Sequence, residues 1–166
     1  MTQMPAIEGS GSARGFAFAV VVSKYHDFIT ARLEAGALAA LQAAGAGDAV
    51  TIVRVPGAFE IPQAARCAAE SGRFHAVVCL GCLIKGETPH FDFIASAVSQ
   101  GLMDASGDTG VPMAFGVLTT DTWEQAEERA GSGRDNKGFE AAAAAIEMAR
   151  LFRRLHPTRP AGFASS

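Results

Sequence analysis

The sequence predicts an α/β domain in which helices cover both faces of a parallel β-sheet. Four apolar segments alternate along the chain with segments of helical periodicity, and the first, residues 16–22 (FAFAVVV), is apolar throughout. Alternation of strands with helices indicates parallel pairing, and a strand without polar positions is typical of one buried on both faces. The 166 residues fit one domain with a core of ordinary size.

The first half of the chain contains three of the expected strands and two of the expected helices. The strands are residues 16–22, 50–55 and 75–80. After a loop at residues 23–27, the first helix places Ile29, Leu33, Ala37 and Leu41 on one face and ends at Gly45. The second helix follows the turn at residues 56–60 and carries Ile61, Ala65 and Ala68. This apolar spacing is that of helices packed on a sheet.

The most informative stretch is residues 81–93 (GCLIKGETPHFDF), which we interpret as a turn from the third strand into a helix. Thr88 is the expected N-cap, and Pro89 the first helical residue, where its missing N–H costs nothing. Free backbone N–H groups then gather at the helix start, which is a ready anion site. His90 lies in the same first turn, so a titratable imidazole is expected beside an anion pocket.

The second half continues with a fourth strand at residues 113–118 and two more helices. Thr122 and Gln125 form a capping-box pattern that opens a short helix to Ala130. Residues 131–136 are a polar break, and residues 137–155 form a long alanine-rich helix. The predicted domain is therefore residues 15–155, with a flexible N-terminal arm at residues 1–14 and a flexible tail at residues 156–166.

Composition limits the class of protein. The net charge is −3, so the overall charge does not indicate a nucleic-acid-binding protein. No apolar run is long enough to span a membrane. The N-terminus lacks the layout of a signal peptide. The three cysteines, Cys67, Cys79 and Cys82, lie in apolar or site-flanking positions and are odd in number. They are expected to be buried, reduced thiols of a cytoplasmic protein.

In a parallel sheet, ligands collect at the carboxyl ends of the strands. Residues 23–27, 56–60, 81–90 and 118–122 should therefore meet at one edge. Arg129 is expected about two helical turns, or roughly 10 Å, from that edge. Lys137 follows the next break in the chain. If these two residues act at the edge, it is the edge of a neighbouring subunit.

Each candidate residue also has a plainer interpretation. His90 could be a surface residue, Thr88 only a cap, and Phe59 a core aromatic; for Phe115, inside a strand, the core is the favoured interpretation. Arg129 could be a solvated helix residue paired with nearby glutamates, and Lys137 an ordinary helix-start lysine. Glu87 is unexpected, because a carboxylate beside an anion pocket repels the anion unless it points away. The residues alone predict a phosphate-type pocket with an imidazole and aromatic walls, without defining the reaction.

Five motifs carry a resemblance to a known family. They are SKYHDFIT at residues 23–30, VPGAFEIP at 55–62, LGCLIKGETPHFDF at 80–93, FGVLTT at 115–120, and QAEERAG with NKG at 125–131 and 136–138. Together they resemble lumazine synthase over most of the chain. The resemblance implies a three-layer, flavodoxin-like sandwich with a four-stranded parallel sheet, whose N-terminal arm could add an edge strand in a neighbour.

The resemblance also implies the reaction and the site. The family condenses 5-amino-6-(D-ribitylamino)uracil with 3,4-dihydroxy-2-butanone 4-phosphate to 6,7-dimethyl-8-ribityllumazine, the penultimate step of riboflavin biosynthesis, without a cofactor. His90 matches the proton-transfer residue. Glu87, Thr88 and Arg129 match the phosphate-binding positions, with Arg129 supplied by the adjacent subunit. The pyrimidine and ribityl positions match Tyr25, Ala58, Phe59, Glu60, Cys82, Leu83, Ile84, Phe115 and Lys137.

Assembly and partners follow from the same resemblance. The expected unit is a homopentamer with shared sites, which could stack into larger shells, and riboflavin synthase is the expected functional partner.

Tyr25 replaces a phenylalanine or tryptophan, and Glu87 and Pro89 depart from the usual pattern at the phosphate site. Two other hypotheses stay open at this point: a ligand-binding or shell-forming relative without catalysis, and a Schiff-base aldolase that uses Lys85 or Lys137.

Overall fold

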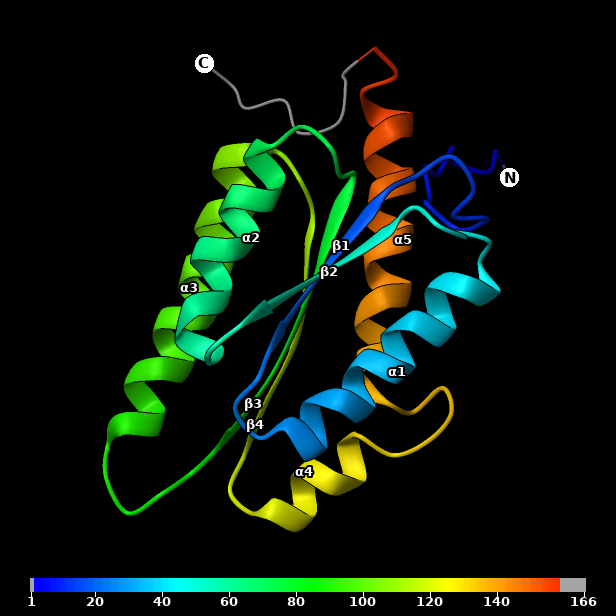
Figure 1. Ribbon diagram of the computed structural model, residues 1–166. Helices are drawn as coiled ribbons and strands as arrows, with labels where there is room; N and C mark the ends of the chain where they lie inside the picture. The colour runs from blue at the N-terminus through cyan, green and yellow to red at the C-terminus, as the bar shows by residue number, and fades with distance from the viewer. Residues whose placement is uncertain (1, 159–166) are drawn as a thin grey trace.

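The computed structural model describes residues 2–158 and contains a four-stranded sheet in which every strand pair is parallel. The strands are β1 (Phe18–Ser23), β2 (Val50–Val55), β3 (Ala76–Ile84) and β4 (Met113–Thr120), in the order β2-β1-β3-β4. Helices lie on both faces of this sheet (Figure 1). The predicted fold class, a three-layer α/β sandwich with a four-stranded parallel sheet, is confirmed.

The helices divide between the two faces of the sheet. One face is covered by α2 (Ile61–Glu70) and α3 (His90–Thr109), and the other by α1 (Asp27–Ala43) and α5 (Lys137–Leu155) (Figure 1). A short helix, α4 (Trp123–Arg129), lies at the lower end of the molecule in that view, and a 3₁₀ turn, η1 (Ala58–Glu60), directly precedes α2. Each face of the sheet has its own hydrophobic core.

The position of β1 inside the sheet explains why polar and apolar residues do not alternate in its sequence. Val20 and Val22 belong to the core beneath α1 and α5, whereas Ala19 and Val21 belong to the core beneath α2 and α3. Successive side chains of a strand point to opposite faces, so a central strand must be apolar at every position. All six residues of β1 are buried.

Strand β3 is longer than predicted. The sequence interpretation ended it at Leu80 and began a turn at Gly81, but residues 81–84 pair with residues 117–120 of β4. Gly81 is a packing requirement here, because a Cβ at this position would come within 2.9 Å of the Ile61 side chain of α2. The turn therefore begins after Ile84.

The start of α3 also differs from the prediction by one residue. Pro89 is the N-cap and His90 the first helical residue, and no side chain caps this end. Thr88 is thus not the N-cap. The other predicted helix starts are confirmed: Thr122 Oγ1 accepts a hydrogen bond from the N–H of Gln125 at 3.2 Å, and α5 spans Lys137–Leu155.

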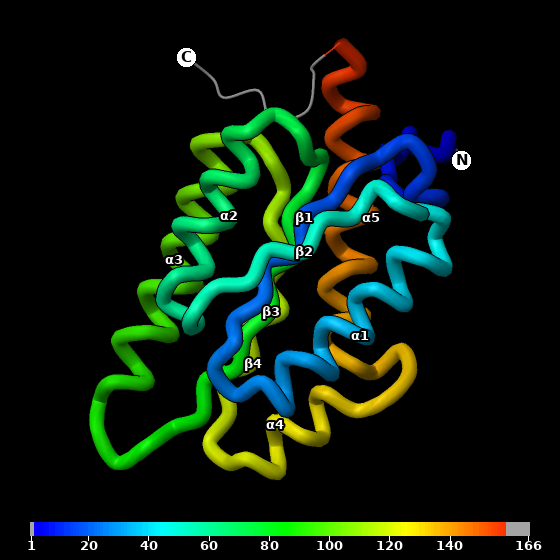
Figure 2. The backbone as a smooth tube through the Cα atoms, viewed as in Figure 1, coloured from blue at the N-terminus to red at the C-terminus, as the bar shows by residue number. Residues whose placement is uncertain are grey.

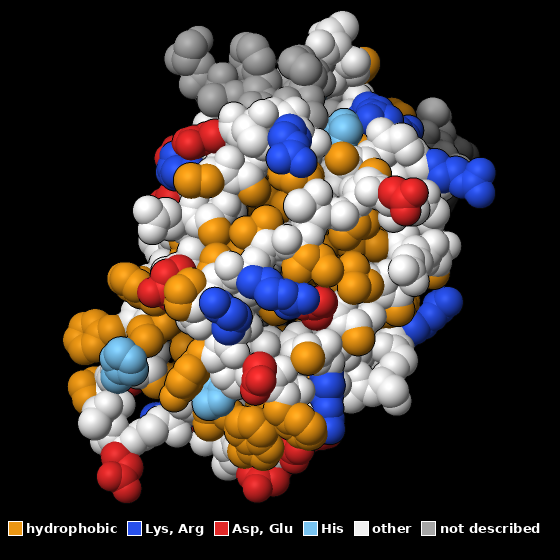
Figure 3. Space-filling view, in the orientation of Figure 1, with side chains coloured by type: hydrophobic (Ala, Val, Ile, Leu, Met, Phe, Trp, Pro, Cys, Tyr) orange, Lys and Arg blue, Asp and Glu red, His pale blue; other side chains and the backbone are white. Residues whose placement is uncertain are grey.

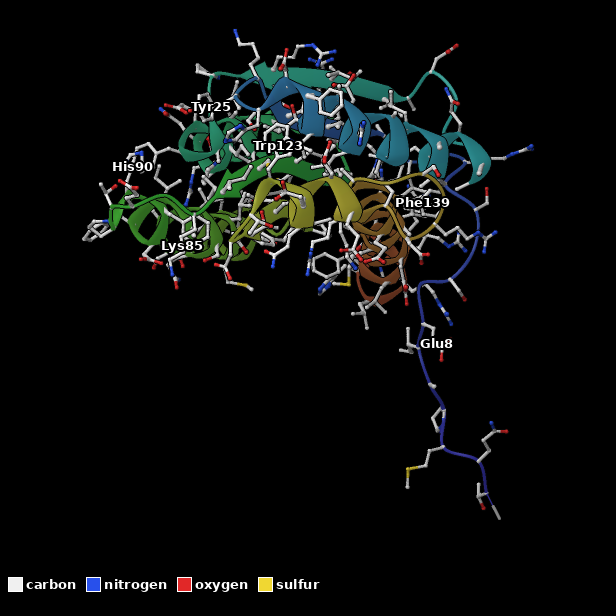
Figure 4. The ribbon with its side chains drawn as sticks, turned by 90° about the horizontal axis from the view of Figure 1, so that it is seen from below. Glu8, Tyr25, Lys85, His90, Trp123 and Phe139 are labelled. Carbon is white, nitrogen blue, oxygen red and sulfur yellow. The ribbon has the colours of Figure 1, made fainter. Side chains whose placement is uncertain are left out.

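The second half of the N-terminal arm is hydrogen-bonded to α5. Arg150 of α5 donates hydrogen bonds to the backbone carbonyls of Ser10 and Ser12, and Arg154 donates one to that of Glu8. Ala13 is fully buried against the α1–α5 side of the core. Before Glu8 the arm runs away from the body of the molecule (Figure 4). Flexibility of the arm stays a prediction, and most of the predicted tail lies outside the described residues.

Chain connectivity defines where a ligand crevice should form. From β1 the chain passes through α1 to β2 on one side, and from β2 it passes through α2 to β3 on the other side of β1 (Figure 2). The connections on the two sides lie on opposite faces of the sheet. In such sheets a crevice opens at the carboxyl ends of the two strands where the direction reverses, here β1 and β3.

Candidate active site

A cavity of about 900 Å³ occupies this crevice. Its walls come from the loop after β1, from η1 after β2, from the end of β3, and from the starts of α3 and α4. Nine of the sequence-predicted site residues line it: Tyr25, Ala58, Phe59, Glu60, Cys82, Leu83, Ile84, Thr88 and His90. The parallel sheet thus gathers nine predicted residues that are up to 65 positions apart in the sequence, from Tyr25 to His90.

Aromatic side chains form one wall of the cavity. The ring of His26 lies between Tyr25 and Trp123, with ring centroids 4.4 Å and 5.6 Å away. Figure 4 shows Tyr25, Trp123 and His90 at the same end of the molecule. Tyr25 is 67% exposed and Phe59 62% exposed, so both present a free ring face. An exposed aromatic face is suited to stacking on a planar heterocycle.

His26 and Trp123 were not among the predicted site residues. His26 has φ 58° and ψ 48°, and among the described non-glycine residues it is the one with a left-handed backbone. Such a conformation is costly and clusters at functional sites. Burial lowers the pKa of His26, which favours the neutral form of the ring. The sequence signal was the SKYHD loop itself, which places a second imidazole next to Tyr25.

The turn after β2 is held by its own glutamate. Glu60 Oε2 accepts a hydrogen bond from the backbone N–H of Gly57 at 3.0 Å, which closes the 3₁₀ turn between them. Ala58 is buried under this turn, and Phe59 extends outward from it. The turn therefore presents backbone groups and one ring to the cavity.

The end of β3 contributes apolar side chains and a protonated thiol. Cys82 is 1% exposed, and burial raises its pKa to about 11. A thiol with such a pKa is uncharged at pH 7 and is a poor nucleophile. Cys79 is fully buried and its pKa is raised to about 12. The prediction of buried thiols holds for these two residues and is wrong for Cys67, which is exposed on α2.

The start of α3 forms the opposite wall. Gly86, Thr88 and His90 line the cavity, whereas Glu87 is exposed and does not line it. A carboxylate outside the cavity removes the expected conflict with an anion at the helix start. Free N–H groups at the first turn give this end of α3 a partial positive charge. Hydrophobic and histidine side chains gather at this end of the surface (Figure 3).

The remaining three predicted residues form a separate group. Phe115, Arg129 and Lys137 line a concavity of about 370 Å³ beside β4, an edge strand of the sheet. Phe115 is 48% exposed, so the favoured interpretation as a core aromatic was wrong. Lys137 Nζ pairs with Glu140 at 2.8 Å, and Arg129 donates to the carbonyl of Gln125 at 3.1 Å. Within one chain these residues do not meet the cavity of His90.

Within residues 2–158, no group of three or more His, Cys, Asp or Glu side chains is arranged to hold a metal ion. None of the described helices has the length and apolar character needed to cross a membrane.

The fold and the cavity together define a flavodoxin-like α/β protein with a small-molecule site at the carboxyl edge of its sheet. A family model described as 6,7-dimethyl-8-ribityllumazine synthase matches residues 15–153. A curated relative with the same description, from Syntrophus aciditrophicus (strain SB), is 54% identical over 154 residues, which are 92% of this chain and 100% of the relative. The chain belongs to the 6,7-dimethyl-8-ribityllumazine synthase family. Its reaction is the transferase step of riboflavin biosynthesis that forms this lumazine.

Proposed function

We propose that the chain condenses 5-amino-6-(D-ribitylamino)uracil with 3,4-dihydroxy-2-butanone 4-phosphate in the cavity between β1, β3 and α3. The observation that carries the assignment is the meeting of Tyr25, Thr88 and His90 around one cavity, in a chain of this family. A planar pyrimidine stacks on the aromatic wall, and the phosphate lies at the start of α3.

The substrates supply most of the reactive groups. The amine of the pyrimidine attacks the ketone carbon, and loss of water forms an imine. A proton then leaves carbon, the phosphate departs as the leaving group, and ring closure releases a second water. The protein positions the two substrates and moves protons through His90, the imidazole nearest the start of α3. Cys82 takes no covalent part, because its thiol is protonated.

The phosphate needs a cation that the cavity of one chain lacks among its lining residues. Arg129 supplies it from the adjacent subunit, where the concavity beside β4 faces the neighbour's cavity. Phe115 and Lys137 reach the pyrimidine side from the same concavity. A guanidinium is well suited to this role, since it binds phosphate through two parallel hydrogen bonds.

A ring of identical chains satisfies this requirement at every site, and the proposed ring is a homopentamer. Two features support close subunit contact. Phe93 and Met103 of α3 are 73% and 71% exposed, and such large apolar side chains mark an interaction surface. Both edges of the four-stranded sheet are also open in the single chain. The arm before Glu8 is long enough to add a strand to a neighbour's sheet, and rings could stack into a shell.

The cellular setting follows from the reaction. We propose that the enzyme works in the cytoplasm and that riboflavin synthase takes up its product. Neither nucleic acid nor membrane takes part. The Schiff-base alternative needs a lysine within the cavity, but neither Lys85 nor Lys137 lines it, and Lys137 is paired with Glu140.

The test is turnover of the purified chain with the two substrates, followed by the fluorescence of the lumazine product. We expect product to require both substrates and phosphate to be released in equal amount. Binding of the lumazine without turnover would support a non-catalytic relative instead. Borohydride added during turnover should trap no adduct on the enzyme, and a stable adduct at a lysine would favour the Schiff-base route.

A further inference from the structure

Asn136 is a buried polar residue between the short helix α4 and the long helix α5. Its side-chain Oδ1 accepts hydrogen bonds from the backbone N–H groups of Gly138 at 2.8 Å and Phe139 at 3.1 Å. This is an N-cap of α5, and it satisfies two of the free N–H groups at the helix start. Only 3% of Asn136 is exposed, which is unusual for a capping residue.

The other end of the same amide binds three backbone carbonyls. Asn136 Nδ2 lies 2.7 Å from the carbonyl oxygen of Gly131, 3.2 Å from that of Ala130 and 3.1 Å from that of Arg32. Ala130 and Gly131 directly follow α4, and Arg32 belongs to α1. One side chain therefore ties the end of α4 and the start of α5 to each other and to α1.

The surrounding backbone is shaped to admit this amide. A Cβ at Gly36 would overlap Oδ1 of Asn136, and a Cβ at Gly138 would overlap the backbone carbonyl of Leu33. Helices α1 and α5 thus approach closely only because both positions are glycine. The two lone pairs of Oδ1 match its two N–H donors, and the three carbonyls share the two hydrogens of Nδ2.

The two residues assigned above to the neighbour's site flank this amide in the sequence. Arg129 is the last residue of α4 and immediately precedes Ala130, and Lys137 is the residue after Asn136. Residues 132–135, which join them, are exposed. We propose that Asn136 is a positioning residue for catalysis, whose amide fixes Arg129 and Lys137 relative to each other. The inference rests on the proposed roles of those two cations.

The direct test removes the donor end of the amide and keeps the cap. Asn136→Asp retains an oxygen that can accept from Gly138 and Phe139, but it sets a carboxylate against the three carbonyls. We expect its Kd for inorganic phosphate, measured by calorimetry on the assembled protein, to rise about tenfold. Asn136→Ser keeps a capping oxygen without a buried charge, and it serves in the same measurement if the Asp variant does not fold.

The matched control is Thr109→Val, at the end of α3 remote from His90. Thr109 is 1% exposed, donates to the carbonyl of Ala105 at 2.7 Å and accepts from the N–H of Val111 at 3.3 Å. It should lower thermal stability and leave the phosphate Kd unchanged. If the Asn136 variants lose stability like this control and keep wild-type phosphate affinity, Asn136 is only structural and the inference is wrong.

Arg129→Ala separates this inference from the function on which it rests. If Arg129→Ala itself leaves the phosphate Kd unchanged, the proposed role of Arg129 fails. If it weakens phosphate binding and the Asn136 variants do not, only the positioning role fails. We expect the double variant Arg129→Ala with Asn136→Asp to bind phosphate no more weakly than Arg129→Ala alone, because Asn136 acts through Arg129.

Discussion

His75 Nδ1 accepts a hydrogen bond from the backbone N–H of Ala17 at 2.9 Å, and this contact joins the residue before β3 to the residue before β1. The guanidinium of Arg153 in α5 lies 3.3 Å from the other ring nitrogen, Nε2. Burial and the positive charge of Arg153 lower the pKa of His75. Protonation would remove the acceptor for Ala17 and place two cations side by side.

We predict that acid weakens the fold through His75. Because the folded-state pKa is lowered, the unfolded chain binds this proton more tightly. The contribution to the free energy of unfolding is complete above the unfolded pKa of about 6.5 and is lost as the pH falls below it. Urea unfolding of the wild type and of His75→Asn, at equal protein concentration, should show a smaller loss between pH 7.5 and 5.5 for the variant. Equal pH slopes would contradict the prediction.

The proton-transfer role of His90 predicts a loss of rate with substrate binding retained. His90→Ala should lower kcat about 10- to 10³-fold, because general acid–base catalysis supplies only part of the acceleration. The KM values should change little, since His90 is exposed and belongs to neither of the two hydrophobic cores. Steady-state kinetics between pH 5.5 and 8.5 check this, and a variant with the wild-type kcat across that range would remove His90 from the mechanism.

Arg129 is predicted to act on only one of the two substrates. Arg129→Ala should raise KM for the butanone phosphate by about tenfold or more and change KM for the pyrimidine far less. Arg129→Lys should recover only part of the affinity, because an ammonium lacks the planar fork of the guanidinium. Arg134→Ala is the charge-matched control, since Arg134 is exposed in the next loop and does not line the concavity of Arg129. Similar rises in both KM values for Arg129→Ala would argue against the phosphate role.

Shared sites predict that two damaged chains can restore each other. A site in a mixed ring is intact where an Arg129→Ala chain, which supplies His90, adjoins a His90→Ala chain, which supplies Arg129. Random co-assembly in equal amounts should give about a quarter of the wild-type activity, because each of the two positions is filled correctly half of the time. Unfolding and refolding the variants together, with separately refolded samples as controls, measures this. Mixed rings as inactive as the two parents would mean that each site belongs to one chain.

Much of the fold and part of the site follow from the sequence by itself. Continuous apolar runs predict buried parallel strands, and residues 50–55 and 137–155 form the strand and the helix expected there. The capping box at Thr122 and Gln125 is equally local, because its partners are three residues apart. Since parallel strands end at one edge, the meeting of Tyr25, the turn at Ala58–Glu60 and His90 could also be predicted.

Tertiary contacts decided the rest. Gly81 resembles the start of a turn, and only its pairing with Val117 of β4 makes it a residue of β3. Phe115 lies in a strand, and its exposure follows from the position of β4 at the sheet edge. His26 gains Trp123 as an aromatic neighbour because the loop after β1 meets the start of α4. These features depend on residues distant in sequence, and local periodicity contains no information about such pairings. The same packing separates Arg129 and Lys137 from the cavity of their own chain.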